Sequence, residues 1–169
     1  RLPLHGGLAP LVCVSRRSAF AVPDGLGVIE AALAEPMAVA VHAVRRAPTM
    51  LGAVVMILGA GPIGLGVLQS ATAAGARTTI VTEISPARRA AAERLGATAV
   101  IDPTTVDPYS AVRDLTRHGV DVVFETTAND TALAQGIRSL RPRGTLVSVA
   151  GWGELARVDM GVSMAKEID

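Results

Sequence analysis

Cysteine, aromatic residues and excess charge are all scarce in this chain of 169 residues. The single cysteine, Cys13, excludes an internal disulfide framework and is typical of a reducing compartment, so we expect a cytoplasmic protein. Because aromatic residues make up 2% of the chain and hydrophobic residues 50%, the core must be built from aliphatic side chains and alanine. The formal net charge is +1 and no basic run occurs, which argues against a nucleic-acid surface.

Charged residues are absent from 47–76, a stretch long enough to cross a membrane in principle. Two prolines, Pro48 and Pro62, and six glycines interrupt this stretch. Its apolar residues also divide into a strand-length block and a block with helical periodicity. A buried strand, turn and helix therefore explain the stretch better than a membrane span, and the N-terminus shows no signal-peptide pattern.

The most informative motif follows an apolar run, VVMIL at 54–58, which is typical of a fully buried parallel strand. The sequence GAGPIG occupies 59–64 directly after it. Gly59 suits the tight turn, Gly61 lets a pyrophosphate approach the backbone, and Gly64 allows close packing of the next helix. Free N–H groups at that helix N-terminus favour phosphate. The motif predicts a dinucleotide site.

An acidic residue, Glu83, follows Gly64 by 19 positions and ends the second predicted strand. A carboxylate there can accept both hydroxyls of the adenosine ribose. It also repels the 2′-phosphate of NADP, so we predict NAD, although Arg88 and Arg89 lie close by and leave NADP open. The alternative is an ordinary turn with a solvated Glu83.

Strand and helix patterns alternate regularly along most of the chain. Pairs of a capping residue and proline, at 85–86 and 107–108, open two of the helices, and Asn129 or Asp130 caps a third. Gly96 and Gly119 close the first two. This alternation predicts an α/β fold with a doubly wound parallel sheet, whose ligands bind at the carboxyl ends of the strands. The predicted strands are 53–58, 78–83, 98–101, 120–124 and 145–150.

The first part of the chain does not follow this alternation. Residues 11–14 and 20–22 resemble short strands, and a helix follows over 28–46 with a break at Ala34–Glu35, because Pro36 belongs near a helix start. Two strands without a helix cannot bury themselves. The first segment therefore belongs to a domain that lies mostly outside this chain, and both chain ends look cut.

Several segments together resemble the medium-chain, zinc-dependent alcohol dehydrogenases, and most closely their sorbitol and butanediol dehydrogenase branch. They are AALAEPMAVA at 31–40, the glycine motif at 59–64, LGA at 95–97 and GVDVVFE at 119–125. The segments 6–9 and 21–24 fit the end of that family's GroES-like catalytic domain. The resemblance implies that 1–27 is a remnant of the GroES-like domain and 28–169 a Rossmann-type NAD-binding domain, truncated at its C-terminus.

The resemblance also implies a reaction. Hydride passes between a secondary alcohol, polyol or vicinal diol and NAD, while a catalytic zinc acts as a Lewis acid on the alcohol oxygen. The remaining zinc ligands of the family would precede residue 1, so this chain is expected to be inactive alone. Members of the family form homodimers or homotetramers.

Site residues follow from the resemblance motif by motif. It implies that Glu35 ligates the zinc or reaches it through a water. The cofactor-binding residues that it implies are Val39 and Val149 near the nicotinamide, Gly61, Pro62 and Ile63 at the pyrophosphate, Glu83 and Arg88 around the ribose, and Thr126 and Thr127 on the adenosine side. Ala128 departs from the family, which has glycine there.

Other interpretations stay open. Glu35 could be only a first-turn acid favoured by the helix dipole. His42 lies two helical turns after Glu35, too far along the axis for both to bind one metal. The chain could also be a non-catalytic NAD-binding module. A third possibility is an S-adenosylmethionine-dependent methyltransferase, which shares the glycine turn and the acidic residue.

Overall fold

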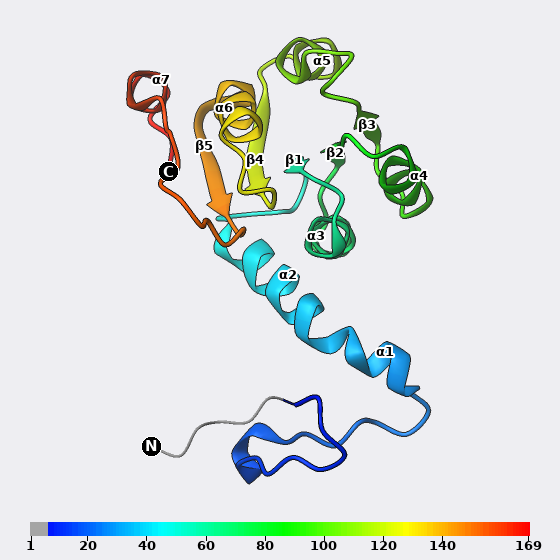
Figure 1. Ribbon diagram of the computed structural model, residues 1–169. Helices are drawn as coiled ribbons and strands as arrows, with labels where there is room; N and C mark the ends of the chain where they lie inside the picture. The colour runs from blue at the N-terminus through cyan, green and yellow to red at the C-terminus, as the bar shows by residue number, and fades with distance from the viewer. Residues whose placement is uncertain (1–6) are drawn as a thin grey trace. The chain divides into compact units, whose positions relative to one another are not determined.

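The computed structural model describes residues 7–169 and divides the chain into two units, Arg1–Ala34 and Glu35–Asp169 (Figure 1). The predicted GroES-like remnant begins at residue 1, so its first six residues lie outside the described ones. Within the second unit, strands and helices alternate as expected.

The described residues of the N-terminal unit, 7–34, form a short 3-10 helix, η1 (Arg16–Ser18), and one α-helix, α1 (Val28–Ala32). The two strands predicted at 11–14 and 20–22 are wrong, because the described residues form no strand there. Strand backbone needs a partner strand for its N–H and C=O groups, and none is present between residues 7 and 34. The side chains that suggested strands are exposed, Leu11 by 91% and Phe20 by 88%.

The second unit carries the remaining elements. They are α2 (Ala34–Arg46, which starts at the last residue of the first unit), β1 (Val54–Leu58), α3 (Pro62–Ala73), β2 (Thr78–Thr82), α4 (Pro86–Arg94), β3 (Ala99–Ile101), α5 (Pro108–Leu115), β4 (Val120–Glu125), α6 (Asp130–Ser139), β5 (Leu140–Ser148) and α7 (Met160–Ala165).

All five strands form one parallel sheet in the order β3-β2-β1-β4-β5. The chain runs outward from β1 to β3 and then returns to β4 on the other side of β1. The strand order therefore reverses between β1 and β4, where open α/β sheets bind ligands. The predicted doubly wound Rossmann-type sheet is confirmed.

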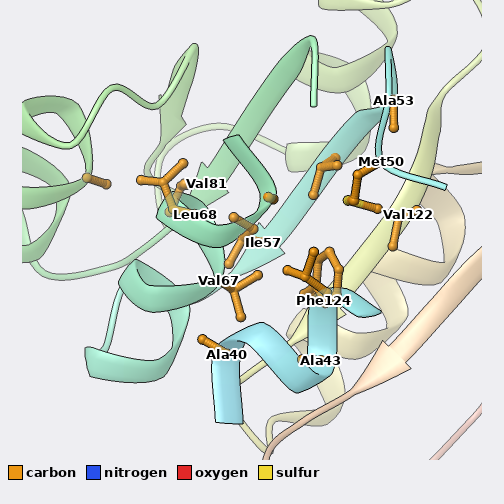
Figure 2. Close-up of a cluster of buried hydrophobic side chains, with 14 of the residues drawn as sticks. Ala40, Ala43, Met50, Ala53, Ile57, Val67, Leu68, Val81, Val122 and Phe124 are labelled. Carbon is orange, nitrogen blue, oxygen red and sulfur yellow. The ribbon is translucent and has the colours of Figure 1, made fainter. Parts of the chain in front are cut away.

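Both faces of the sheet are covered, which explains why β1 is buried along its whole length. One cluster joins Ile57 of β1 and Phe124 of β4 to α2 and α3, as Figure 2 shows. On the other face, Met56 and Leu58 pack with Val112 of α5. Small residues allow this close packing. A Cβ at Gly136 of α6 would lie within 3 Å of Leu58 and Val123 side-chain atoms.

Apart from strand ends that shift by one or two residues, three features differ from the prediction. The break before α2 falls at Leu33, one residue earlier than expected. Strand β5 begins at Leu140 rather than at residue 145, because the segment predicted as a turn continues along β4 with a register irregularity. Helix α7 was not predicted. The Asp159 side chain caps it by accepting a hydrogen bond from the Val162 amide, 3.1 Å away.

Candidate functional site

The glycine turn lies at the carboxyl end of β1. Gly59 has a φ of +94°, a left-handed conformation that glycine adopts without strain. Its amide donates to the Thr82 carbonyl of β2 at 2.8 Å, which ties the turn to the neighbouring strand. A Cβ at Gly64 would overlap the Gly59 carbonyl oxygen, so the first turn of α3 packs directly on this loop.

The N-terminus of α3 is open toward solvent. Gly61 is its N-cap and offers no side chain to the first-turn amides, and Pro62 is the first helical residue. No heavy atom beyond its chain neighbours lies within 4 Å of the place where a Cβ at Gly61 would be. Because the first N–H groups of a helix lack internal partners and carry the positive end of the helix dipole, this opening suits an anion.

Glu83 follows β2, and its side chain is held in place by backbone amides. Its Oε2 accepts a hydrogen bond from the Ala60 amide and its Oε1 accepts one from the Ser85 amide, both at 2.8 Å. The residue is only 6% exposed, whereas Arg88, whose Nη1 lies 4.0 Å from Oε2, has a side chain that is 59% exposed. Each carboxylate oxygen keeps a lone pair for a ligand hydroxyl. Ser85, which was expected to cap α4, makes no side-chain capping bond.

Arg89 supports this region and was not predicted as a site residue. Its Nη1 donates to the carbonyl of Ile84 at 2.6 Å and forms an ion pair with Asp102 Oδ2 at 2.9 Å. Hydrogen bonds from the Thr104 hydroxyl and amide lower the pKa of Asp102 below its ordinary value, with a smaller contribution from Arg89. Asp102 directly follows β3, and this position at the end of a predicted strand could have identified it as a site residue from the sequence.

The loop after β4 completes this side of the site. The Thr126 hydroxyl donates to the Leu58 carbonyl at 2.7 Å, at the residue just before the glycine turn. A Cβ at Gly59 would meet the Thr127 methyl group at 2.8 Å. The two threonines are therefore seated against the turn.

A cavity of about 510 Å³ opens among these segments. It brings together six of the predicted residues, Gly59, Gly61, Glu83, Arg88, Thr126 and Thr127. Gly64 is buried beneath the turn, and Pro62 and Ile63 are not among the lining residues. Sequence reasoning missed the other lining residues, which are Thr82, Ile84, Pro103, Thr104, Asn129, Thr131, Ala132 and Gln135.

A second cavity, of about 600 Å³, lies between α2 and β5. It brings together Val39 and Val149, the two residues expected near the nicotinamide. His42 and Arg46 of α2 and Ser148 add polar groups to its wall. Most of the predicted cofactor residues therefore fall into two groups, one that lines the cavity at the ends of β1, β2 and β4, and the pair of Val39 on α2 and Val149 after β5.

Glu35 stands apart from both groups. It is exposed in the first turn of α2. Within residues 7–169, no three His, Cys, Asp or Glu side chains lie close enough together to hold a metal ion. The described residues therefore do not form a complete zinc site, and the role of Glu35 as a zinc ligand stays a prediction.

The residues that line the first cavity, of about 510 Å³, combine two recognition elements. The open helix N-terminus favours a phosphate, and the anchored carboxylate of Glu83 favours vicinal hydroxyl groups. A molecule that carries both, such as a nucleotide, matches the arrangement. Among the described residues, no helix is long and apolar enough to cross a membrane.

Comparison with known proteins agrees with this geometry. A family profile described as zinc-binding dehydrogenase matches residues 62–169. Among curated proteins, sorbitol dehydrogenase of Bacillus subtilis is 37% identical over 148 residues, which are 87% of this chain and 42% of that protein. The (R,R)-butanediol dehydrogenase of the same organism is 38% identical over 163 residues, 96% of this chain and 47% of that protein.

Solved structures show the same likeness. The 2R,3R-butanediol dehydrogenase of Bacillus subtilis superposes with a TM-score of 0.82 at 38% identity, over 88% of this chain and 43% of that one. A zinc-binding dehydrogenase of Sinorhizobium meliloti, solved bound to NADP, gives 0.86 at 34% identity over 92% and 47%. The chain spans less than half the length of these relatives.

Proposed function

Because the chain belongs to the zinc-binding dehydrogenases, we propose that its second unit is the coenzyme-binding part of an enzyme that transfers hydride between a secondary alcohol and NAD. The relatives are named for sorbitol and butanediol, so the proposed substrate is a polyol or vicinal diol. The observation that carries the proposal is the cavity where the Gly61 opening and the Glu83 carboxylate meet.

The residues of this cavity fit a nicotinamide dinucleotide. In the proposed complex, the amides at the start of α3 bind the pyrophosphate, and Gly61 leaves room for it to approach. Glu83 accepts the hydroxyls of the adenosine ribose, and Thr126 and Thr127 contact the adenosine. The Ala60 and Ser85 amides hold the Glu83 carboxylate in place before the ligand arrives.

The same carboxylate favours NAD over NADP. A phosphate on the 2′ position would lie against a nearly buried negative charge, which is unfavourable unless a cation compensates. Arg88 is the nearest cation found, but its side chain is mostly exposed, and its guanidinium lies at the limit of an ion pair with Glu83. NADPH is therefore proposed to bind more weakly than NADH.

The nicotinamide end is proposed to lie at the second cavity, with Val39 and Val149 against the ring. When bound, the nicotinamide accepts the hydride from the carbinol carbon. Apolar side chains on one face of the ring would exclude water from it and fix its orientation.

Glu35 is proposed as a zinc ligand whose partner ligands lie outside the described residues. A homodimer or homotetramer is proposed because β5 lies at the edge of the sheet. A cytoplasmic location is proposed because the only cysteine, Cys13, is exposed and free.

A titration tests the coenzyme proposal. NADH, NADPH and S-adenosylmethionine are added in turn to the chain, and binding is followed by nicotinamide fluorescence or calorimetry. We expect NADH to bind at least about tenfold more tightly than NADPH, a difference of about 1.4 kcal/mol. Binding of S-adenosylmethionine alone would overturn the proposal and favour the methyltransferase alternative.

Gly61→Ala sharpens this test. Apart from its chain neighbours, no protein atom lies within 4 Å of the position of the added methyl group, so the variant is expected to fold normally. It would occupy the approach of the pyrophosphate and weaken NADH binding by about tenfold or more. Gly7→Ala, which also meets open space and is not a site residue, is the matched control. Equal NADH affinity in both variants would contradict the proposed site.

A further inference from the structure

Glu125, the last residue of β4, is a carboxylate buried in the interior. Its exposed fraction is 0%, and no ion pair involves it among the described residues. A charged or polar group in such a place must be satisfied by hydrogen bonds or it destabilises the fold. Its partners therefore indicate what the residue does.

One oxygen of Glu125 receives all of these bonds. Oε1 accepts from the Thr127 amide at 2.5 Å, from the Thr127 hydroxyl at 2.7 Å and from the Ala128 amide at 2.8 Å. Oε2 has no hydrogen-bond partner in the part of the chain that the structure describes. Three hydrogen bonds to a single acceptor atom thus hold the loop after β4.

This loop is the one that meets the glycine turn. Thr127, held by two of the three bonds, places its methyl group where a Cβ at Gly59 would be too close. The preceding residue, Thr126, is tied to the Leu58 carbonyl, so the loop is fixed at both ends. Both threonines line the cavity proposed for the adenosine.

The main chain of Glu125 fixes a second wall. Its carbonyl accepts from the Val149 amide at 2.9 Å and from the Ala150 amide at 3.1 Å. These bonds hold the end of β5, where Val149 lines the second cavity. One residue therefore ties together segments from both proposed halves of the coenzyme site.

We propose that Glu125 is a positioning residue for the coenzyme, which orders the 126–128 loop through Oε1 and aligns it with the end of β5. The inference rests on the proposed function, because it assigns those walls to a nicotinamide dinucleotide. Since only Oε1 has partners, a neutral amide oxygen in the same place can do the same work. The role depends on the acceptor and not on the charge.

Three variants test this role in the full chain. Glu125→Gln keeps an acceptor oxygen, whereas Glu125→Met keeps the length and removes it. Asp121→Asn is the control. Asp121 lies four residues earlier on the same face of β4, and its carboxylate accepts from Val54 and Arg141 at the other end of the strand. Melting curves establish that each variant folds, and NADH titrations measure binding.

We expect Glu125→Met to weaken NADH binding by about tenfold or more and Glu125→Gln to stay within about threefold of the original chain. Asp121→Asn should lower the melting temperature without changing the affinity. Original affinity in folded Glu125→Met, or equally weak binding in the Gln and Met variants, would overturn the proposal.

Hydrogen exchange separates this inference from the proposed function. Without any coenzyme, the Thr127 and Ala128 amides should exchange slowly in the original chain and in Glu125→Gln, and at least about tenfold faster in Glu125→Met. Unchanged exchange would show that Glu125 does not order the loop. If the chain binds no NADH but this exchange pattern holds, the proposed function fails and the ordering of the loop stands.

Should Glu125→Met fail to fold, Thr127→Val supplies the same comparison. This variant removes the hydroxyl donor to Oε1 and leaves the two backbone donors and the shape of the side chain. It should raise exchange of the Ala128 amide and weaken NADH binding by a smaller factor, about threefold. No change in either measurement would overturn the role of Oε1.

Discussion

At the scale of single residues, Ala128 adopts an unusual backbone conformation in the 126–128 loop. Its φ is +50°, in the left-handed region that alanine adopts at a cost of about 1–2 kcal/mol. The Ala128 amide donates to Glu125 Oε1, and this bond helps to hold the conformation. Glycine, which the dehydrogenase resemblance places here, would meet the same geometry without the Cβ clash. Alanine in place of the family's glycine at 128 therefore adopts the left-handed conformation, and the loop keeps its hydrogen bond to Glu125.

Ala128→Gly should stabilise the protein. Relief of the left-handed strain is partly offset by the greater freedom of glycine in the unfolded chain, which leaves a net gain of about 0.5–1 kcal/mol. Ala134→Gly, in the interior of α6 and exposed, is the control and should destabilise by about 1 kcal/mol. Urea denaturation measures both, and a loss of stability in Ala128→Gly would contradict the argument.

At the scale of elements, the helices that enclose the sheet begin in two different ways. Asp107 accepts from the Ser110 amide at 3.1 Å, and Asn129 accepts from the Ala132 amide at 3.0 Å, so both are true side-chain caps. Ser85 occupies the equivalent position before α4, but its hydroxyl makes no such bond. Its amide instead donates to Glu83. The residue at the N-cap position thus stabilises the helix start in α5 and α6 but contacts the candidate site before α4.

Replacing the caps by alanine should reveal this difference. Asp107→Ala and Asn129→Ala should each lower the free energy of unfolding by about 1 kcal/mol, because a first-turn amide loses its partner. Ser85→Ala should change it by no more than about 0.3 kcal/mol. These values are compared by chemical denaturation. A loss in Ser85→Ala as large as in the other two would show that its hydroxyl caps α4 after all.

At the scale of the whole molecule, the core belongs to the second unit. The buried hydrophobic residues run from Ala40 to Leu140, and no residue between 7 and 34 is buried. The two faces of the sheet are closed by α2 to α6, which all lie in the same part of the chain. The second unit therefore carries the hydrophobic stabilisation of this chain by itself.

A shortened chain of residues 34–169 should fold cooperatively. It retains α2 from its first residue and, of residues 7–169, every buried hydrophobic side chain. We expect its melting temperature to lie within about 3 °C of the longer chain, a change of less than about 1 kcal/mol, and its NADH affinity to be unchanged. Calorimetry checks the first expectation and titration the second. A non-cooperative transition would show that the N-terminal residues contribute to the fold.

Local patterns were enough to predict much of this arrangement. The apolar run before Gly59, the capping pairs and the closing glycines act within a few residues, so they indicate strands, helices and their order without knowledge of distant contacts. The same holds for the glycine turn and for Glu83, whose residue types match what the proposed dinucleotide site requires. The resemblance to dehydrogenases followed from these local segments and is confirmed by the family match.

Contacts between distant residues could not be predicted in this way. Three sets of contacts each join the ends of different strands. They are the hydrogen bond from Ala60 to Glu83, the ion pair of Arg89 with Asp102, and the contacts of Glu125. The prediction of strands near Leu11 and Phe20 was wrong for the same reason, since a β-prone segment becomes a strand only beside a partner strand. Preferences for helix, strand or turn depend on neighbouring residues, but hydrogen-bond pairing across a sheet exists only after the chain has folded.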